Sequence, residues 1–465
     1  MAQYEAVVVG AGPNGLAAAV ELTNSGRRVL IVERAQTIGG GTRTEELTQP
    51  GFLHDVCSAI HPLGPASPFF RSHGIGDWIQ PEIPVTHPLP NGRVGVLHRD
   101  LGETVDGLGD DGNRYRRWIS SMVDKSDTIL PQVLGPLPLA PSHLVDLARF
   151  GVPGLLPAST VGRSFRTDEA RGLYAGLAAH ALAPLNAPMT GAAAQVFAMT
   201  AHAYGWPLVS GGSQRIAEQM AQMVTDEGGA IETGRHVESI DELPSAPIVV
   251  LDVMPDAAKR IVGDRVDRAS RKRLGRWKSG PGVFKVDWAL DGPIPWTDEA
   301  SPRAGTVHVG GTFEEVAAAE RAVHNGDHPD RPFVFVAQQS LFDPSRAPAG
   351  RQTAWGYCHV PAGSAVDMTS AIESQIERFA PGFRDRIIAR HTMDSVAYQD
   401  HNPNYVGGDI AGGAFTARKV LQFGRTRPYR IGEGVYLCSS ATPPGGGVHG
   451  MCGYHAARAA IDDAG

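Results

Sequence analysis

Residues 5–33 read EAVVVGAGPNGLAAAVELTNSGRRVLIVE, and this stretch decides the class of fold. Residues 5–9 are a short β-branched run, which is typical of a buried parallel strand. A glycine-rich turn follows, and the Ala- and Leu-rich residues after it predict a helix that stops at Gly26. Residues 28–32 predict a second strand, which ends at Glu33. This order predicts a Rossmann-type α/β unit.

The glycines of the turn have the spacing of a dinucleotide-binding fingerprint. Gly10 permits the tight turn, Gly12 lets the backbone approach a pyrophosphate, and Gly15 lets the helix pack closely on the strand. The start of the helix offers free N–H groups to phosphates, and Glu33 can accept hydrogen bonds from a ribose diol. The alternative is a glycine-rich turn without a chemical role, but the flanking strands and the acidic residue favour dinucleotide binding.

A second glycine cluster distinguishes FAD from NAD. Residues 38–46 read IGGGTRTEE, where a domain that binds NAD would normally carry its next strand and helix. A glycine cluster at this place resembles the second pyrophosphate-contact motif of glutathione-reductase-like FAD domains. A plain left-handed turn is the alternative interpretation.

The C-terminal end of the chain predicts another strand, turn and helix. Residues 434–439 read GVYLCS, and the glycine-rich turn after them leads into an Ala-rich helix expected to start near Val448. A helix N-terminus aimed at the N1–C2=O edge of a flavin would stabilise the negative charge that develops there on reduction. A generic unit that closes the sheet is the alternative.

Together these stretches resemble the superfamily of flavin-dependent amine oxidases and phytoene desaturases, in its carotenoid-oxidoreductase-like branch. The similarity also covers the central block PLVSGGSQRIAEQMAQMVTDEGGAIETGRHVESI, the stretch FDPSRAPAG and the turn PPGGGVHGMCGYHAA, so it spans the whole chain. One residue departs from the family pattern, because Gly41 stands where many members carry Arg, and the nearest Arg is Arg43.

The resemblance implies a discontinuous FAD-binding domain of residues 1–70, 205–265 and 425–465. A substrate domain of mixed sheet and helical cap would comprise residues 71–204 and 266–424. A strand after the helix of residues 211–228 would contain Val237, whose backbone would contact the adenine. The cofactor-binding residues implied in this way are Gly10, Gly12, Pro13, Asn14, Gly15, Glu33, Arg34, Gly40, Gly41, Thr42, Val237, Ser440, Ala441, Val448, His449, Gly450 and Met451.

Two residues are candidates for a catalytic role. Residues 280–296 predict a strand with Phe284, Val286 and Trp288 on one face and Lys285 and Asp287 on the other. By resemblance, Lys285 matches a lysine that holds a water over flavin N5; a solvated lysine at a sheet edge is the alternative. His449 lies inside the C-terminal glycine turn, where a helix N-terminus should lower its pKa and keep it neutral.

Two further segments allow a functional and a structural interpretation. Residues 129–160 are rich in Leu, Pro and Ala, and their proline content excludes one long helix. They form either an apolar mouth that meets lipid or a packed cap. His401, Asn402 and Tyr405 lie among turn formers, so they either face the open side of the flavin or serve ordinary turn chemistry.

Composition excludes several other classes. The net charge of −7 and the lack of long Lys/Arg runs argue against nucleic-acid binding. No CxxC pair or second G-x-G-x-x-G on a strand–helix boundary is present, which argues against a dithiol centre, a zinc ribbon and a separate NAD(P)H domain. The start of the chain lacks a signal peptide pattern, and no run of apolar residues could span a membrane, so we expect a cytoplasmic protein, with peripheral membrane contact left open.

The sequence therefore predicts an α/β flavoprotein with FAD as cofactor and no metal. The resemblance implies hydride removal or delivery at a carbon centre of a lipophilic substrate, by desaturation, saturation or isomerisation. Amine oxidation and a non-catalytic, flavin-bound interaction protein are the alternatives. Oxygen, a quinone or another electron acceptor all fit these residues.

Overall fold

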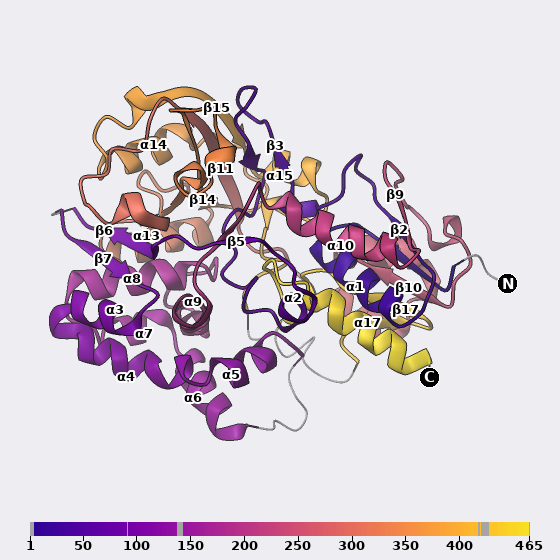
Figure 1. Cartoon of the computed structure of the whole chain (residues 1–465). Coiled ribbons are helices and arrows are strands. Elements are labelled where there is room, and N and C mark those ends of the chain that lie inside the picture. Colours follow the sequence, from indigo (N-terminus) through magenta and orange to yellow (C-terminus); the bar gives the residue numbers. More distant parts are fainter. Residues whose placement is uncertain (1–3, 91, 137–142, 417–418, 420–426, 465) are drawn as a thin grey trace.

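The first of the two large sheets contains the N-terminal glycine motif. The computed structural model describes residues 4–90, 92–136, 143–416, 419 and 427–464 (Figure 1). Six strands have the spatial order β16-β17-β10-β1-β2-β9, and all neighbours are parallel except β16 and β17. Their bounds are β1 Ala6–Val9, β2 Val29–Val32, β9 Ala230–Glu232, β10 Ile248–Leu251, β16 Arg430–Gly432 and β17 Val435–Leu437.

Alternating side chains of β1 bury both faces of this sheet. Ala6 and Val8 belong to the core that contains three helices, α1 (Pro13–Asn24), α10 (Gln214–Asp226) and α17 (Met451–Ala464). Val7 and Val9 instead pack with α11 (Pro255–Val262) and with the end of α12 (Arg268–Leu274) on the opposite face. The N-terminal strand is therefore central to a three-layer arrangement.

The second sheet has seven strands in the order β15-β11-β14-β13-β12-β6-β7. Its pairs are antiparallel except β12 with β6. Helix α14 (Thr369–Glu377) covers one face through Ile372 and Ile376. The strands are β6 Ile83–Pro88, β7 Val94–Leu97, β11 Gly282–Leu290, β12 Ala304–Val309, β13 Val334–Ala337, β14 Gln352–Val360 and β15 Ile387–Met393.

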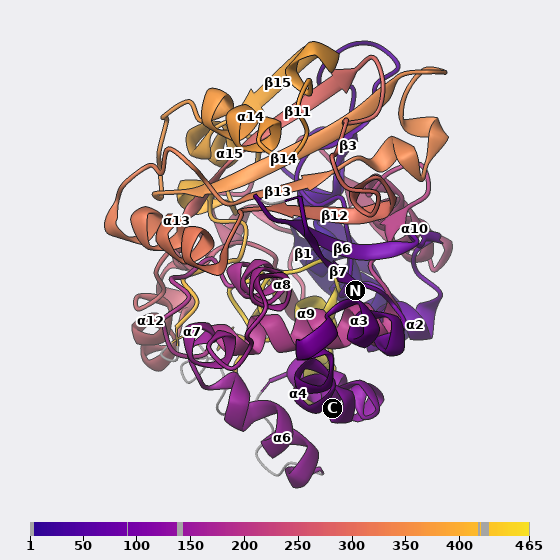
Figure 2. The same ribbon diagram turned by 90° about the vertical axis from the view of Figure 1, so that its left-hand side faces the viewer.

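A layer of helices lies beneath the other face of the second sheet (Figure 2). It includes three short helices where the proline-rich segment excludes a long one. Helix α13 (Phe313–Asn325), which packs on α8, begins with the reciprocal capping box of Thr312 and Glu315. The layer consists of α3 Leu101–Gly107, α4 Gly112–Val123, α5 Ser126–Val133, α6 Leu144–Gly154, α7 Ala158–Gly162, α8 Asp168–Ala179 and α9 Thr190–Tyr204.

The predicted fold class is confirmed: a Rossmann-like sheet with helices on both faces is joined to a second mixed sheet with a helical layer. The domain boundaries stay a prediction. No helix in the described ranges combines the length and the hydropathy that a membrane crossing requires. Shorter elements complete the chain, namely β3 Thr44–Glu45, β4 His54–Asp55, β5 Trp78–Ile79, β8 Leu208–Val209, α2 Pro68–His73 and α15 Ser395–His401.

Candidate functional site

A cavity of about 1380 Å³ extends between the two sheets and the helical layer. One end, here called the glycine lobe, is lined by the motifs of the first sheet and by the C-terminal loop. The other end, here called the apolar lobe, is lined by side chains of the helices and of the second sheet. The residues that define the apolar lobe are Gln132, Val133, Leu134, Leu147, Phe150, Gly151, Gly154, Leu155, His180, Ala181, Leu182, Met189, Ala192, Ala193, Val196, Phe197, Trp206, Thr306, Phe335, Trp355 and Tyr357.

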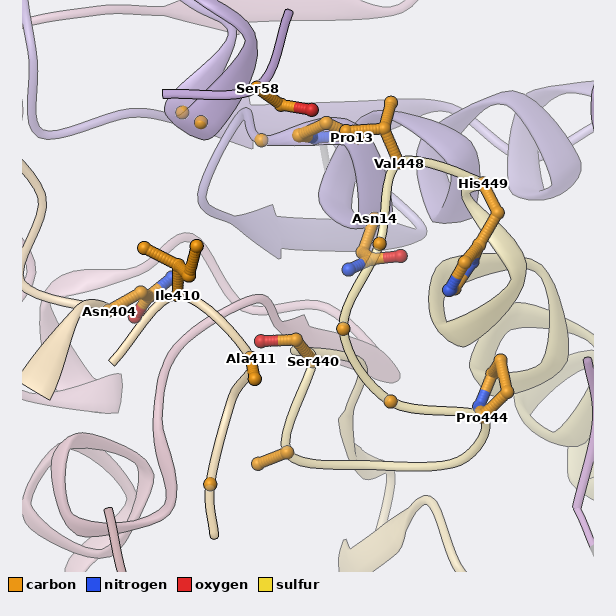
Figure 3. Close-up of a pocket in the computed structure, with 18 of the residues that line it drawn as sticks. Pro13, Asn14, Ser58, Asn404, Ile410, Ala411, Ser440, Pro444, Val448 and His449 are labelled. Carbon is orange, nitrogen blue, oxygen red and sulfur yellow. The ribbon is translucent and has the colours of Figure 1, made fainter. Parts of the chain in front are cut away.

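The glycine turn presents the start of α1 to the cavity. Gly10 has a φ of +103°, and Gly12 is the N-cap of α1 without a side-chain cap. Gly15 does not line the cavity, because it faces the strand, where an added Cβ would collide with the carbonyl of Gly10. Its role is therefore the close packing of helix on strand, while Gly12, Pro13 and Asn14 form the wall (Figure 3).

Asp252, at the end of β10, is a site residue that the sequence analysis missed. Its Oδ2 accepts a hydrogen bond of 2.9 Å from the backbone N–H of Gly15, so a carboxyl group caps α1 from the neighbouring strand. Asn404 donates to the carbonyl of Asp252 at 2.8 Å and holds this segment in place. Burial raises the pKa of Asp252 to about 7, which favours the neutral acid next to the N-terminus of α1.

Glu33 lies at the end of β2, as predicted, and lines the cavity. Its two carboxylate oxygens accept hydrogen bonds from the backbone N–H groups of Ala11 and Ala35, at 2.7 and 2.8 Å. Each oxygen has further acceptor capacity, so the carboxylate is held rigidly without being saturated.

Arg43 supplies the cation that the second glycine cluster lacks. Gly40 and Gly41 line the cavity, whereas Thr42 is fully buried and donates its hydroxyl to the carbonyl of Gly39. Arg43 lines the cavity two positions after Gly41, 3.6 Å from Glu33, and its Nε has no partner among the described residues. The departure at Gly41 therefore does not remove the positive charge from this wall.

The C-terminal loop continues the wall beside the start of α1, where Ser440, Val448 and His449 lie near Pro13 and Asn14 (Figure 3). Ala441 also lines the cavity. The predicted helix start near Val448 is wrong. Helix α17 begins at Met451, because Gly450 has a φ of +67°, which a right-handed helix does not allow. Gly450 and Met451 consequently lie behind the wall rather than on it.

His449 is neutral, as expected, but the main cause differs from the predicted one. Burial lowers its pKa to about 4, whereas the sequence analysis attributed the shift to the helix terminus. Its Nδ1 accepts a 3.0 Å hydrogen bond from the backbone N–H of Met451. The imidazole thus caps the first turn of α17 and places its ring on the cavity wall.

Lys285 is not on the cavity wall, and it is not a solvated residue of a sheet edge. Strand β11 is the second strand of its sheet and is buried along its whole length. The ammonium group lies 2.5 Å from Asp287 and donates to the carbonyl of Asp55 at 3.0 Å. His54 and His391 flank the same carboxylate at 3.5 and 3.6 Å. The structure places Lys285 in a buried ion pair under the wall rather than on it.

The remaining residues that the sequence analysis named lie on the cavity wall. Arg34 and Val237 line the cavity, but Val237 follows β9 in irregular backbone, because Gly234 with a φ of +70° ends the strand. His401, Asn402 and Tyr405 also line it, and the Tyr405 hydroxyl contacts Gly41. The structure therefore brings this loop to the glycine lobe, opposite the second glycine cluster.

The apolar lobe combines side chains of the Leu- and Pro-rich segment 129–160, of which residues 137–142 lie outside the described residues, with side chains that the sequence did not indicate. The main feature of the apolar lobe is that none of its defining residues is Lys, Arg, Asp or Glu. The ring of Tyr357 stacks on Phe335 at 4.7 Å, and Trp355 lies 5.4 Å from Tyr357. These three residues come from the adjacent strands β13 and β14, and no local sequence motif indicates that they line a cavity. The lobe can hold a large apolar molecule and keep water from it.

Comparisons with known proteins agree with this architecture. A family model described as an NAD(P)-binding Rossmann-like domain matches residues 8–72. The chain is 26% identical to pyridine nucleotide-disulfide oxidoreductase domain-containing protein 2 of Rattus norvegicus, over 99% of this chain and 94% of that protein. It is 23% identical to the neurosporene-forming phytoene desaturase of Rhodobacter capsulatus, over 96% and 92%.

Solved structures show the same fold. An oxidoreductase from Methanosarcina mazei superposes with a TM-score of 0.67 and 17% identity, over 98% of this chain and 99% of that one. Cyclohexylamine oxidase from Brevibacterium oxydans gives 0.61 and 17%, over 99% of each chain. Fold and cavity thus define a dinucleotide-binding protein of the oxidoreductase class. Over nearly its whole length the chain is similar to proteins of the superfamily of flavin-dependent amine oxidases and phytoene desaturases.

Proposed function

We propose that the protein is an FAD-dependent oxidoreductase that acts at a carbon centre of a lipophilic substrate. The observation that carries this proposal is the continuity of the cavity, which joins a dinucleotide-type wall to an apolar lobe without charged residues. A cofactor and an apolar substrate held in the two lobes would share one enclosed space.

The residues of the glycine lobe fit FAD. The N-terminus of α1, whose N-cap Gly12 has no side chain, and the unpartnered Nε of Arg43 suit a pyrophosphate, and Glu33 suits a ribose. Asn14 carries a buried amide oxygen without a partner among the described residues, which a ligand group could satisfy. The C-terminal loop, from Ser440 to His449, would hold the flavin end. When bound, the flavin supplies hydride transfer.

The chain's own residues then have the tasks of orientation and of water exclusion. The aromatic rings of Phe335, Trp355 and Tyr357 form a rigid surface on one side of the lobe. Phe150 and Val196, from α6 and α9, line it from the helical layer. Such a wall positions a carbon skeleton by shape, because it offers few hydrogen bonds.

Desaturation, saturation or isomerisation fits this wall better than amine oxidation. Relatives include enzymes whose names refer to phytoene, limonene and zeta-carotene. Structural neighbours include putrescine oxidase and cyclohexylamine oxidase, but an ammonium group entering the apolar lobe would meet no carboxylate among its defining residues. The proposal therefore takes a neutral, lipophilic substrate.

The outer face of α6 favours peripheral contact with a lipid surface. Leu144, Val145 and Val152 are each about two-thirds exposed, while Leu147 and Phe150 of the same helix line the cavity. One helix thus separates the apolar lobe from an exposed apolar patch. We propose that a lipophilic substrate reaches the lobe from this side, and that the electron acceptor is oxygen, a quinone or another small molecule.

The visible spectrum of the purified protein tests the proposal, recorded before and after denaturation with chromatography of the released cofactor. A flavin spectrum with releasable FAD is expected, followed by anaerobic bleaching on addition of an apolar substrate. A protein that lacks FAD and does not take it up contradicts the proposal. Bound flavin that no substrate bleaches would favour a non-catalytic, flavin-bound interaction protein, and bleaching by amines alone would favour amine oxidation.

A further inference from the structure

His180 is the imidazole of the apolar lobe. It follows the last residue of α8, and its ring lies among aromatic rings of the lobe. The centroid distances are 4.3 Å to Phe197, 4.6 Å to Phe335 and 5.9 Å to Trp206. A polar ring among such neighbours needs hydrogen-bond partners, because an unpaired polar group is costly to bury.

One partner is His308 of β12, which is completely buried. The Nε2 atoms of His180 and His308 are 3.3 Å apart. Helix α8 makes room for this pair, because an added Cβ at Gly176 would collide with the ring of His308, and one at Gly172 would press on the ring of His87. Gly172, Gly176 and His180 lie at successive four-residue steps on one face of α8, so the helix surface is shaped around imidazoles.

The pair is uncharged. Burial lowers the pKa of His180 to about 3 and that of His308 well below its ordinary value. Each ring therefore carries a single proton, and one ring must donate to the other across the Nε2–Nε2 contact.

The surroundings of His308 decide which ring donates. Its Nδ1 points at the backbone of α8 near Gly176 and has no partner among the described residues. His87, whose ring centroid is 6.4 Å away, forms its own hydrogen bond with the carbonyl of Gly311. A proton on Nδ1 of His308 would be a buried, unpaired donor, so we assign it to Nε2. His180 then accepts at Nε2 and carries its proton on Nδ1.

We propose that the Nδ1–H group of His180 binds a neutral oxygen atom, of a hydroxyl or a carbonyl group, on an otherwise apolar ligand in the apolar lobe. Nδ1 of His180 has no hydrogen-bond partner within the described part of the chain. It is not among the side-chain atoms that are both fully buried and unpaired there, so it is accessible from the cavity that His180 lines. This inference rests on the proposed function, whose substrate class it narrows.

Two other ligand types fit this donor less well. A pure hydrocarbon leaves the Nδ1–H group desolvated and unpaired. A carboxylate can accept the hydrogen bond, but its charge would be buried in a lobe whose defining residues include no cation. The other polar side chains of the lobe are also neutral, namely Gln132, Thr306, Tyr357, Trp206 and Trp355. The indole N–H of Trp206 donates to Thr306 at 2.9 Å.

The test uses three probes with one carbon skeleton: citronellene, citronellol and citronellic acid. Their dissociation constants are measured on the flavin-loaded protein by quenching of tryptophan fluorescence, because Trp206 and Trp355 line the cavity. Three variants are compared with the natural protein. His180→Phe keeps an aromatic ring without the donor, His180→Gln keeps an N–H donor, and His324→Phe changes an exposed histidine away from the cavity.

We expect His180→Phe to weaken citronellol binding about fivefold, the effect of one ordinary hydrogen bond, and not to weaken citronellene binding. His180→Gln should recover part of the loss, and His324→Phe should match the natural protein. Citronellic acid should bind the natural protein more weakly than citronellol.

The inference is overturned if His180→Phe changes both neutral probes equally or neither, if the acid binds most tightly, or if no probe binds. These results are distinct from a failure of the proposed function. That failure would appear beforehand, as a natural protein whose spectrum shows no flavin and that takes up no added FAD.

Discussion

The two lobes of the cavity are built in opposite ways. The glycine lobe depends mainly on backbone, since Gly10, Gly12 and Gly40 supply its turns and close approaches. The apolar lobe depends on side chains, and wall residues such as Phe150 and Phe335 come from distant parts of the chain. The first lobe can be recognised in a short stretch of sequence, whereas the second exists only after two sheets and a helical layer have packed.

Replacing Lys285 by Met should give the largest loss of stability, and it tests the buried Lys285–Asp287 ion pair beneath the cavity wall. Although burial favours the neutral acid, Lys285 and two histidines keep the pKa of Asp287 below its ordinary value. Lys285→Met leaves that carboxylate without its cation and should lower the free energy of unfolding by about 3–5 kcal/mol. Urea denaturation measures this loss.

Asp287→Asn in the Lys285→Met background is the matched control, and it should recover part of the stability because it removes the uncompensated charge. A Lys285→Met protein of natural stability that no longer allows flavin bleaching would instead support the catalytic role expected from the sequence.

Replacing Gly15 by Ala should disturb the packing of α1 on β1 and thereby the glycine lobe. The new methyl group would collide with the carbonyl of Gly10, so α1 must shift away from β1. We expect a loss of about 2–3 kcal/mol of stability, as for other overpacked sites, together with loss of bound flavin. Flavin absorbance per chain and urea denaturation measure the two effects. Gly107→Ala in α3 is the control, since nothing lies near its added methyl group, and its stability should not fall.

The raised pKa of Asp252 should make the stability of the folded protein depend on pH. Its folded pKa of about 7 lies above the unfolded value near 3.8, so its stabilising contribution is complete below pH 3.8 and is lost as the pH rises through 7. Asp252→Asn removes this dependence and keeps an acceptor for the N–H of Gly15. Between pH 5 and pH 8 the natural protein should lose on the order of 2 kcal/mol more than the variant. Equal losses in parallel denaturation curves would exclude an elevated pKa.

The smallest effect is expected on the outer side of the apolar lobe. Val152→Ser changes an exposed side chain of α6, so stability should stay within about 0.5 kcal/mol. Sedimentation with phospholipid vesicles should nevertheless decrease, because the variant reduces the apolar patch. An exposed Ile388→Ser variant on β15 is the control. Equal sedimentation of both variants and the natural protein would argue against lipid contact through α6.

The comparison also explains how far the sequence could be interpreted. Gly10, Gly12 and Glu33 follow one another along a strand–helix–strand unit, so their spacing alone predicts their meeting in space. The ion pair of Lys285 was not foreseen, because an alternating strand pattern shows which side chains share a face, but not what covers that face. Asp252 and His180 carried no signal, since each acquires its role from a neighbour far along the chain, namely Gly15 and His308.

The order of the strands has a consequence for how the protein is made. The sheet that begins with β1 at Ala6 is completed by β17 at Val435, and the last stretch of cavity wall ends at His449. A growing chain that has left the ribosome only as far as Asp252 therefore has the glycine turn, but it lacks the cavity wall that the C-terminal loop supplies. Cofactor capture must then be a late event in biosynthesis, and a chain truncated before Ser440 should emerge colourless.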